Sequence, residues 1–191
     1  MIAVAMFATS CGAKKAVAEQ PKAGAGNPFG EVFEAPCQVY DTPTEFAATG
    51  IYKGSSNQIG EVHIWALQNA QTLVRTKVSH AYKGMISDYS SSVGNNRGND
   101  LSVKLTRAGD QIIDIVLNNT SETCIKYSQV DDRGMVTCYV AIEISKEELA
   151  AKIASHVKDV LTDEEKMRIG FEEEQYRKQM EQRFKDYKDA H

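Results

Sequence analysis

The segment from Ile59 to Ala81 carries the strongest periodic pattern in the chain and limits the fold most. Small and apolar side chains recur there at three- and four-residue spacing, the period of one helical face. They are Ile59, Val62, Ala66, Ala70, Leu73 and Ala81, with Lys77 as the one polar break and with Trp65, Val74 and Val78 widening the same face. Ala66 and Ala70 are small enough to let a neighbouring element approach closely. We therefore expect a long helix packed on a sheet or on another helix.

Three segments show β-strand patterns. Residues 46–53 form one candidate strand before the helix, and residues 120–130 and 135–144 form two more after it. The last two flank Asp131-Asp-Arg-Gly134, a turn sequence in which glycine supplies a positive φ. The pattern predicts a β-hairpin.

The hairpin register bears on the cysteines. A turn at residues 131–134 places Cys124 opposite Ala141, and not opposite Cys138. A disulfide between the two cysteines would need a shifted register. We therefore expect two buried free thiols, because free cysteine packs as a small apolar side chain.

Other segments predict helices and one loop. The spacing of Leu101, Leu105, Ile112, Val116 and Leu117 predicts a second helix, and the polar residues 87–100 before it predict a loop. Ser145–Glu148 and Thr162–Glu165 have the sequence of capping boxes, which start helices. The first predicts a short helix with Leu149, Ile153 and Val157 on one face, and the second predicts a long charged helix from 162 to 188.

These elements predict an α+β fold. We expect a small antiparallel sheet of order β-α-α-β-β, with two helices on one face and a long C-terminal helix. The expected divisions are a signal at residues 1–10, a flexible tether at 11–38, an α+β domain at 39–148 and a charged helical extension at 149–191.

Cys11 indicates where the protein works. It follows an apolar run over residues 1–8 and the small residues Thr9 and Ser10, as in a bacterial lipoprotein signal. A lipoprotein peptidase needs this thiol because its sulfur carries the diacylglycerol. The run is too short to span a membrane, which takes about 20 apolar residues. It lacks a positive start, so we expect the natural start to lie upstream; an ordinary cleaved signal, or an N-terminus that merely contains a cysteine, is the alternative.

Composition excludes several function classes. The net charge of −4 argues against a nucleic-acid-binding protein, which should be basic. No CxxC, HExxH or GxSxG motif is present, so the sequence indicates no metal site, no cofactor and no catalytic centre. We expect a protein that is not an enzyme.

The order of elements and several short motifs resemble a known family. The motifs are Gly50-Ile-Tyr-Lys-Gly54, the helix with Ala66, Asn69 and Ala70, the turn at residues 131–134, and Tyr139-Val-Ala-Ile-Glu-Ile-Ser145. They resemble the twenty-kilodalton outer-membrane lipoprotein family and the N-terminal domain of the flagellar ring protein FlgT over roughly residues 45–150. The resemblance implies an α+β domain with a dodecin-like β-α-β-β core, a role in envelope assemblies, and no family catalytic residues to transfer.

The function expected from these features is a lipid-anchored outer-membrane protein that acts as a non-catalytic interaction or assembly module. Lys14 and Lys15 after Cys11, in place of an acidic run, favour an anchor that faces the periplasm. The expected partners are the membrane, through the lipid, and an envelope protein or a second copy. A dodecin-like small-molecule-binding domain, with its ligand near Trp65, is the alternative.

The candidate surface for a ligand or partner consists of apolar and aromatic residues. It comprises Trp65 together with Phe171, Tyr176, Met180 and Phe184 from the C-terminal helix. The stripe on that helix, which continues to Tyr187, has two interpretations of equal weight: it packs on the domain, or it docks a partner.

Overall fold

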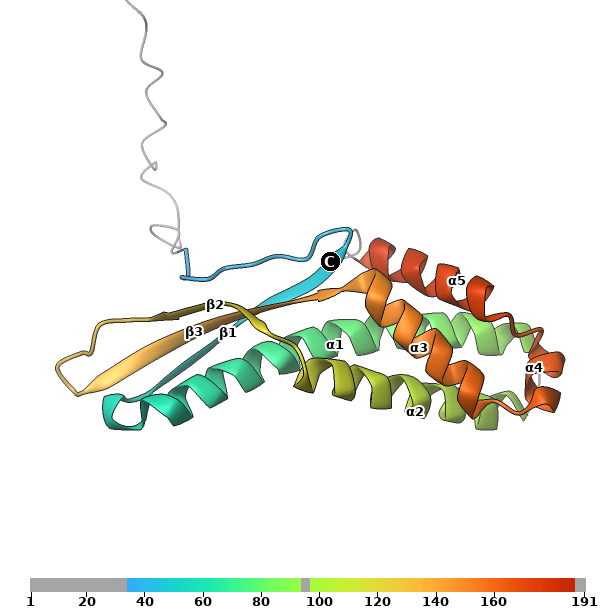
Figure 1. The fold of residues 1–191 in the computed structure, drawn as a ribbon, viewed down its shortest axis with the longest axis horizontal. Helices are drawn as coiled ribbons and strands as arrows, with labels where there is room; N and C mark the ends of the chain where they lie inside the picture. The colour runs from blue at the N-terminus through green and yellow to red at the C-terminus, as the bar shows by residue number, and fades with distance from the viewer. Residues whose placement is uncertain (1–33, 94–96, 188–191) are drawn as a thin grey trace, which may run out of the picture. The chain divides into compact units, whose positions relative to one another are not determined.

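The computed structural model describes residues 34–93 and 97–187. The chain divides into two units, Met1–Glu34 and Ala35–His191, and the description below concerns the second (Figure 1). The predicted signal, Cys11 and most of the predicted tether lie outside the described residues. Residues 35–38, which the sequence placed in the tether, belong to the folded unit.

A three-stranded antiparallel sheet forms one part of this unit. Its strands are β1 (Glu45–Ser55), β2 (Glu122–Tyr127) and β3 (Met135–Ser145), in the order β1-β3-β2. Cys124 pairs with Ala141, as the hairpin sequence predicted, with a bulge between Glu122 and Cys124. The fold class is therefore α+β with a small antiparallel sheet.

The hairpin turn follows from its sequence. Gly134 has a φ of +72°, which a glycine adopts without steric cost. The Asp131 carboxylate accepts hydrogen bonds from the amides of Arg133 and Met135 at 3.0 and 2.9 Å. Side-chain acceptance of nearby amides is the reason aspartate favours turns.

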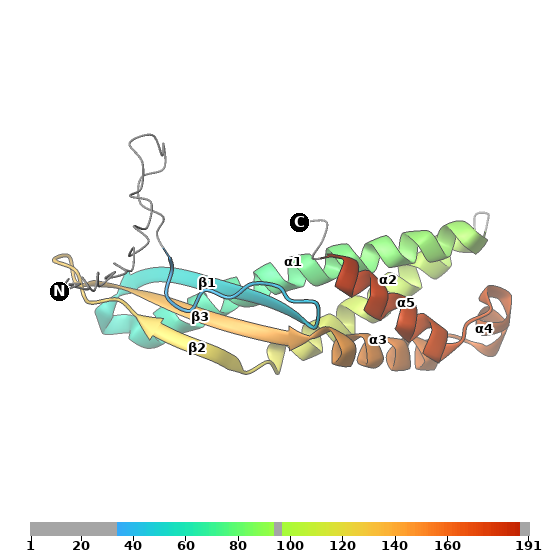
Figure 2. The same ribbon diagram turned by 90° about the horizontal axis from the view of Figure 1, so that it is seen from above.

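Helix α1 (Ile59–Val93) follows β1 through a short 3-10 turn, η1 (Ser56–Gln58). It runs along one face of the sheet and continues beyond the sheet (Figures 1 and 2). Its buried stripe repeats every fourth residue: Val62, Ala66, Ala70, Val74 and Val78. This buried stripe is one residue wide, whereas the predicted apolar face also included the residues beside it. Ile59, Trp65 and Leu73 therefore fall on its flanks and are about half exposed, contrary to prediction.

Helix α2 (Arg97–Asn118) corrects two predictions. The expected loop at residues 87–100 is largely helical, because α1 continues to Val93 and α2 begins at Arg97. Ile86 and Leu101, the buried residues on either side of the polar stretch, anchor the two helices in the core. The second correction concerns the expected pair of helices on one face of the sheet. Helix α2 packs on α1 and on α3 (Lys146–Val160) beyond the end of the sheet (Figure 2), so α1 alone of these two helices covers that face.

The C-terminal region is two helices and not one long helix. These are α4 (Asp163–Ile169) and α5 (Glu173–Asp186). Gly170 ends α4 in a left-handed conformation with φ of +59°, a common way for a helix to stop. The predicted caps are present: Ser145 begins α3, and Thr162 with Glu165 forms a full capping box at α4.

Helices α3 and α5 belong to the core of the domain and are no appended extension. Leu149, Ile153 and Val157 of α3 are buried, as predicted. Tyr176, Met180 and Phe184 of α5 belong to the same buried cluster. The predicted boundary at residue 149 therefore cuts through one core.

A disulfide joins Cys37 to Cys124, with a Cα–Cα distance of 5.6 Å. The expectation of two buried free thiols is wrong for Cys124 and right for Cys138, which is free and buried. No local pattern indicates this pairing, because 87 positions separate Cys37 from Cys124 and Cys37 falls in the predicted tether. Residues 35–41, which carry Cys37 and are here called the strap, lie on the side of the sheet away from α1 (Figure 1).

Side chains cover the outer edge of β1, which no strand pairs with in the described chain. The Asp41 carboxylate accepts the Ala47 amide at 2.8 Å, and the Lys77 ammonium donates to the Ala47 carbonyl at 2.6 Å. The Asn69 amide donates to the Ile51 carbonyl at 2.9 Å. Backbone groups that would otherwise be free along an edge strand are thereby satisfied.

Candidate functional site

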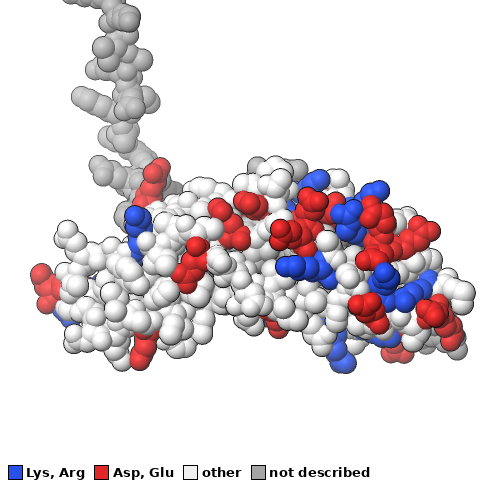
Figure 3. All heavy atoms as spheres, viewed as in Figure 1, with Lys and Arg blue, Asp and Glu red and all other residues white. Residues whose placement is uncertain are grey.

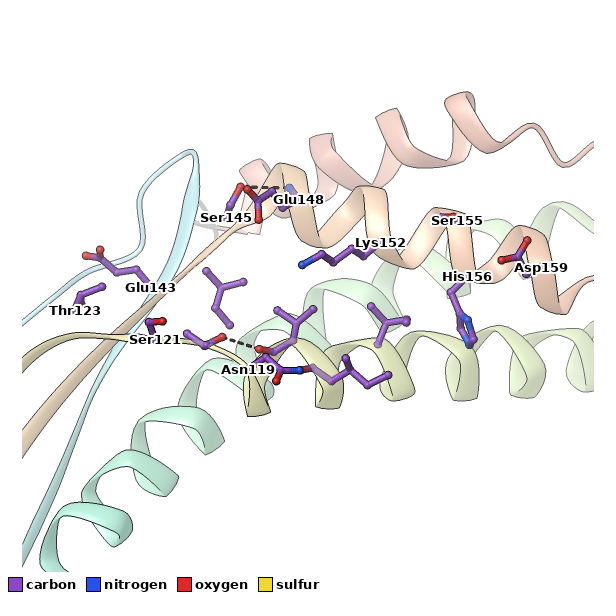
Figure 4. A pocket seen from close by; sticks show the side chains of 15 residues that line it. Asn119, Ser121, Thr123, Glu143, Ser145, Glu148, Lys152, Ser155, His156 and Asp159 are labelled. Atoms are coloured by element: carbon purple, nitrogen blue, oxygen red, sulfur yellow. Dashed lines mark hydrogen bonds between the residues drawn. The ribbon is translucent and has the colours of Figure 1, made fainter. Parts of the chain in front are cut away.

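A groove of about 630 Å³ lies between α2 and α3, next to the ends of β2 and β3 (Figure 4). It is larger than two other hollows along α2, which measure about 390 and 370 Å³. Its lining residues come from the second half of α2, the start of β2, the end of β3 and one face of α3. They include Ile112, Val116, Asn119, Thr120, Ser121, Glu148, Lys152, Ser155, His156 and Asp159.

Helix α3 is amphipathic, and this positions the polar wall of the groove. Glu148, Lys152, Ser155 and Asp159 are spaced by four, three and four residues and so share one face. The opposite face of α3 is buried in the core. The core contacts therefore fix the rotation of α3 that turns its polar residues toward the groove.

The facing wall is the apolar flank of α2. Ile112 and Val116 are partly buried against the core cluster. At the end of α2, the Asn119 side-chain amide donates to the Ile115 carbonyl and the Thr120 hydroxyl donates to the Val116 carbonyl, both at 2.8 Å. These bonds satisfy carbonyls at the helix end. The groove thus joins an apolar wall to a polar one.

The groove is negatively charged. Glu143, Glu148 and Asp159 bring three carboxylates and Lys152 brings one ammonium. Within the part of the chain that the structure describes, none of these four residues forms an ion pair. Lys152 extends along the hollow in Figure 4, so its ammonium is open to a ligand. The charges suit a ligand that carries a cation, or both charges, better than a simple anion.

The hydroxyl and imidazole groups of the groove make local contacts. The Ser145 hydroxyl accepts the Glu148 amide at 3.3 Å as a helix cap. His156 lies 3.2 Å from the Gln111 side-chain oxygen. Nucleophilic catalysis requires a base beside the nucleophile. The described lining residues contain no such pair.

The structure separates the residues that the sequence grouped as a ligand or partner surface. Trp65 is half exposed near the start of α1, with its ring 6.0 Å from that of Tyr52. Tyr176, Met180 and Phe184 are buried, and Phe171 packs its ring 5.3 Å from that of Tyr176. The aromatic stripe of α5 therefore packs on its own domain, the first of the two interpretations, and Tyr176, Met180 and Phe184 are not exposed for docking.

Sequence reasoning missed the groove. The polar spacing on α3 was visible, but such a stripe on a helix usually faces solvent. The polar stripe of α3 faces α2 only because of contacts between segments that are far apart in the sequence. Ile112 and Val116 were assigned to a helix face and not to a cavity wall.

Charges elsewhere are of mixed sign. Figure 3 shows acidic and basic side chains intermingled over the half of the domain that contains α3 to α5. Several form ion pairs between helices, such as Lys158 with Glu173 at 2.9 Å and Lys104 with Glu165 at 2.7 Å. This surface has no dominant sign of charge in that view.

None of the described helices is both long and apolar enough to cross a membrane. No group of three or more histidine, cysteine, aspartate or glutamate side chains in residues 34–93 and 97–187 is arranged to hold a metal ion.

Comparisons with known proteins found no match to a protein-family model, to a curated protein or to a solved structure. The resemblance to outer-membrane lipoproteins therefore stays a prediction from the sequence.

Proposed function

We propose that this chain is a lipid-anchored envelope protein whose folded domain is a non-catalytic binding module. The disulfide between Cys37 and Cys124 carries the proposal. Disulfides persist in oxidising compartments such as the periplasm and are rare in the cytosol. The bond thus supports export independently of the signal-like sequence that ends at Cys11.

The anchor in this proposal is a lipid on Cys11. A thioether-linked diacylglycerol and an amide-linked acyl chain supply three chains, which hold a protein on a membrane where one chain binds reversibly. Lys14 and Lys15 support an outer-membrane position facing the periplasm. The family resemblance supports the same assignment.

The binding role rests on the groove between α2 and α3. It joins an apolar wall to side chains of both charges and holds no catalytic pair among its described residues. A protein partner of the envelope, or a second copy of the chain, would place a mixed polar and apolar segment there. Lys152 and Glu148 would then select for complementary charges.

A small ligand is the second candidate, and the volume of the groove favours it. Small-molecule sites usually enclose about 300–1,000 Å³, and the groove measures about 630 Å³. The sheet has three strands and helix α1 covers one of its faces, and this arrangement supports a ligand-binding domain of dodecin-like type. An absorbance spectrum of protein purified from its native host would reveal a bound chromophore.

The anchor is tested by the intact mass of the protein extracted with detergent from its native host's membranes. We expect a mature form that begins at Cys11 and is heavier by glycerol and three acyl chains. A Cys11→Ser variant should stay unlipidated and leave the membrane fraction. A soluble, unlipidated wild-type protein that retains residues 1–10 would refute the anchor.

The groove is tested by charge reversal in the full chain. Lys152→Glu should abolish in-cell cross-links to envelope components, because it removes the one ammonium of the groove. Lys178→Glu is the matched control, since Lys178 is an exposed lysine on α5 outside the groove. Equal cross-linking by both variants and wild type would show that binding occurs elsewhere.

A further inference from the structure

We propose that the Cys37–Cys124 disulfide is a latch that holds the strap, residues 35–41, across the outer face of the sheet. The outer face is the one opposite α1. Reduction of the bond by a dithiol releases the strap and uncovers this face while the domain stays folded. The inference is independent of the lipid anchor and of the groove.

The contacts of the strap show that it crosses the sheet. Cys37 is bonded to Cys124 on β2, one edge strand. The Cys37 carbonyl accepts a hydrogen bond from the Thr49 hydroxyl on β1, the other edge strand, at 2.6 Å. The same hydroxyl oxygen accepts the Val39 amide at 3.1 Å. Since β3 lies between β1 and β2, a strap joined to both must pass over β3.

The burial of two alanines shows what the strap covers. Ala47 and Ala141 are 1% and 0% exposed, yet neither belongs to the hydrophobic core cluster. They alternate along their strands with Phe46, Val140 and Ile142, which do belong to it. The alanines therefore point to the outer face. Thr49 pairs with Ala141 there, beneath the Cys37 end of the strap.

The far end of the strap is held by polar contacts. The Asp41 carboxylate accepts the Ala47 amide at 2.8 Å and pairs with the Lys77 ammonium at 3.0 Å. None of the strap side chains belongs to the core cluster. Release of the strap thus breaks hydrogen bonds and one ion pair but removes no side chain from the core.

The disulfide is open to a reductant. Both Cys37 and Cys124 are only partly buried. A thiolate of a dithiol attacks one sulfur, forms a mixed disulfide and frees the other cysteine as a thiolate, which takes up a proton. The second thiol of the reductant then closes its own disulfide and releases the first cysteine. Two electrons pass from the dithiol to the protein.

Cys138, the third cysteine of the domain, cannot take the place of Cys37 or Cys124 in the disulfide. Cys138 is free, buried and on the face of β3 that contacts α1. Cys124 pairs with Ala141 on the outer face. A thiol on the opposite face cannot resolve the opened bond, so the latch either reforms with Cys37 or stays open.

The test is hydrogen–deuterium exchange of the full chain in detergent, oxidised and after treatment with dithiothreitol. At short labelling times we expect exchange to rise by about tenfold or more in fragments that contain Val39 and Ala47, because their amides lose the strap contacts. Fragments of β3 that contain Val140 and Ile142 should take up no additional deuterium at those times. The variant Cys37→Ser should reproduce the reduced pattern.

Two results would overturn the latch. Unchanged exchange in the strap after reduction would show that the hydrogen bonds hold it without the disulfide. Loss of protection in β3 at the same short times would show that the disulfide stabilises the whole domain. The matched control is Thr49→Val in the oxidised protein, which removes two strap hydrogen bonds and keeps the disulfide; it should raise exchange at Val39 and leave Ala47 protected through Asp41.

Discussion

Gly50 of β1 lies so close to Ala66 of α1 that a Cβ atom added to the glycine would be 2.0 Å from the Ala66 carbonyl oxygen. The Ala70 amide nitrogen would lie 2.3 Å away. Both are backbone atoms, and backbone atoms cannot move away as the end of a flexible side chain can. The contact sets the distance between helix and sheet.

Gly50→Ala should therefore destabilise the domain. We expect a loss of about 3 kcal/mol in the free energy of unfolding, the cost of overpacking a tight interface. Chemical denaturation followed by circular dichroism measures it. Gly60→Ala is the matched control, because its added Cβ would meet no atom within 4 Å apart from its own stretch of helix backbone. It should be neutral or stabilising by up to about 1 kcal/mol, as alanine favours a helix.

A second prediction concerns acid stability. The Lys104 ammonium, 2.7 Å from the Glu165 carboxylate, and the amide of Thr162 lower the pKa of Glu165 from 4.5 to about 2. The carboxylate thus contributes stability above pH 4.5, and this contribution is lost as the pH falls toward 2. Its size is about 1 kcal/mol, because the pair is partly screened by solvent.

Glu165→Gln tests this pH dependence. The variant should be less stable than wild type at pH 7, and the difference should shrink as the pH falls from 4.5 to 2. Glu164→Gln changes the neighbouring exposed carboxylate and should follow the wild-type curve. A difference for Glu165→Gln that is constant with pH would exclude the ionised pair as its cause.

The third prediction concerns the buried tyrosine pair. The Tyr82 hydroxyl donates to the Leu105 carbonyl at 2.8 Å and lies 3.2 Å from the Tyr176 hydroxyl. Burial and the nearby Tyr176 raise the pKa of Tyr82 well above its ordinary value of 10.0. Tyr82→Phe should cost about 1–2 kcal/mol in unfolding free energy, the usual cost of a lost buried hydrogen bond.

Tyr52→Phe provides the comparison for this change. Tyr52 is 37% exposed, whereas Tyr82 is fully buried. The substitution should leave the unfolding free energy within about 0.5 kcal/mol of wild type. Equal effects at positions 52 and 82 would show that the buried hydroxyl contributes nothing.

The fourth prediction tests whether α5 is part of the core. Phe184 is fully buried, with its ring 5.2 Å from that of Phe46 on β1. Phe184→Ala should cost about 3–5 kcal/mol, as other large buried aromatic truncations do. Met167→Ala, at a position that is 79% exposed, should cost little. A small effect at Phe184 would mean that α5 does not hold the domain together.

Local patterns were enough to predict much of this fold. The strand at 46–53, the hairpin register and the helix starts at Ser145 and Thr162 depend on residues close together in the sequence. Turn and cap chemistry operates over three or four residues, so it can be inferred without the rest of the structure.

The errors share a different cause. The disulfide of Cys37, the groove beside Lys152 and the burial of Phe184 all depend on contacts between distant segments. The apolar stripe of α5 was visible, but a stripe does not reveal whether it meets its own domain or a partner. Gly170 was the available sign that the C-terminal helix stops, because glycine readily takes the left-handed conformation at a helix end.

The covered edge of β1 has a consequence for how copies of this protein behave at high concentration. An uncovered edge strand offers amides and carbonyls to any other extended chain, and sheets can then grow from molecule to molecule. Asp41, Lys77 and Asn69 occupy these groups at Ala47 and Ile51. These three backbone groups are therefore not available to a neighbouring chain, which disfavours growth of the sheet from this part of β1.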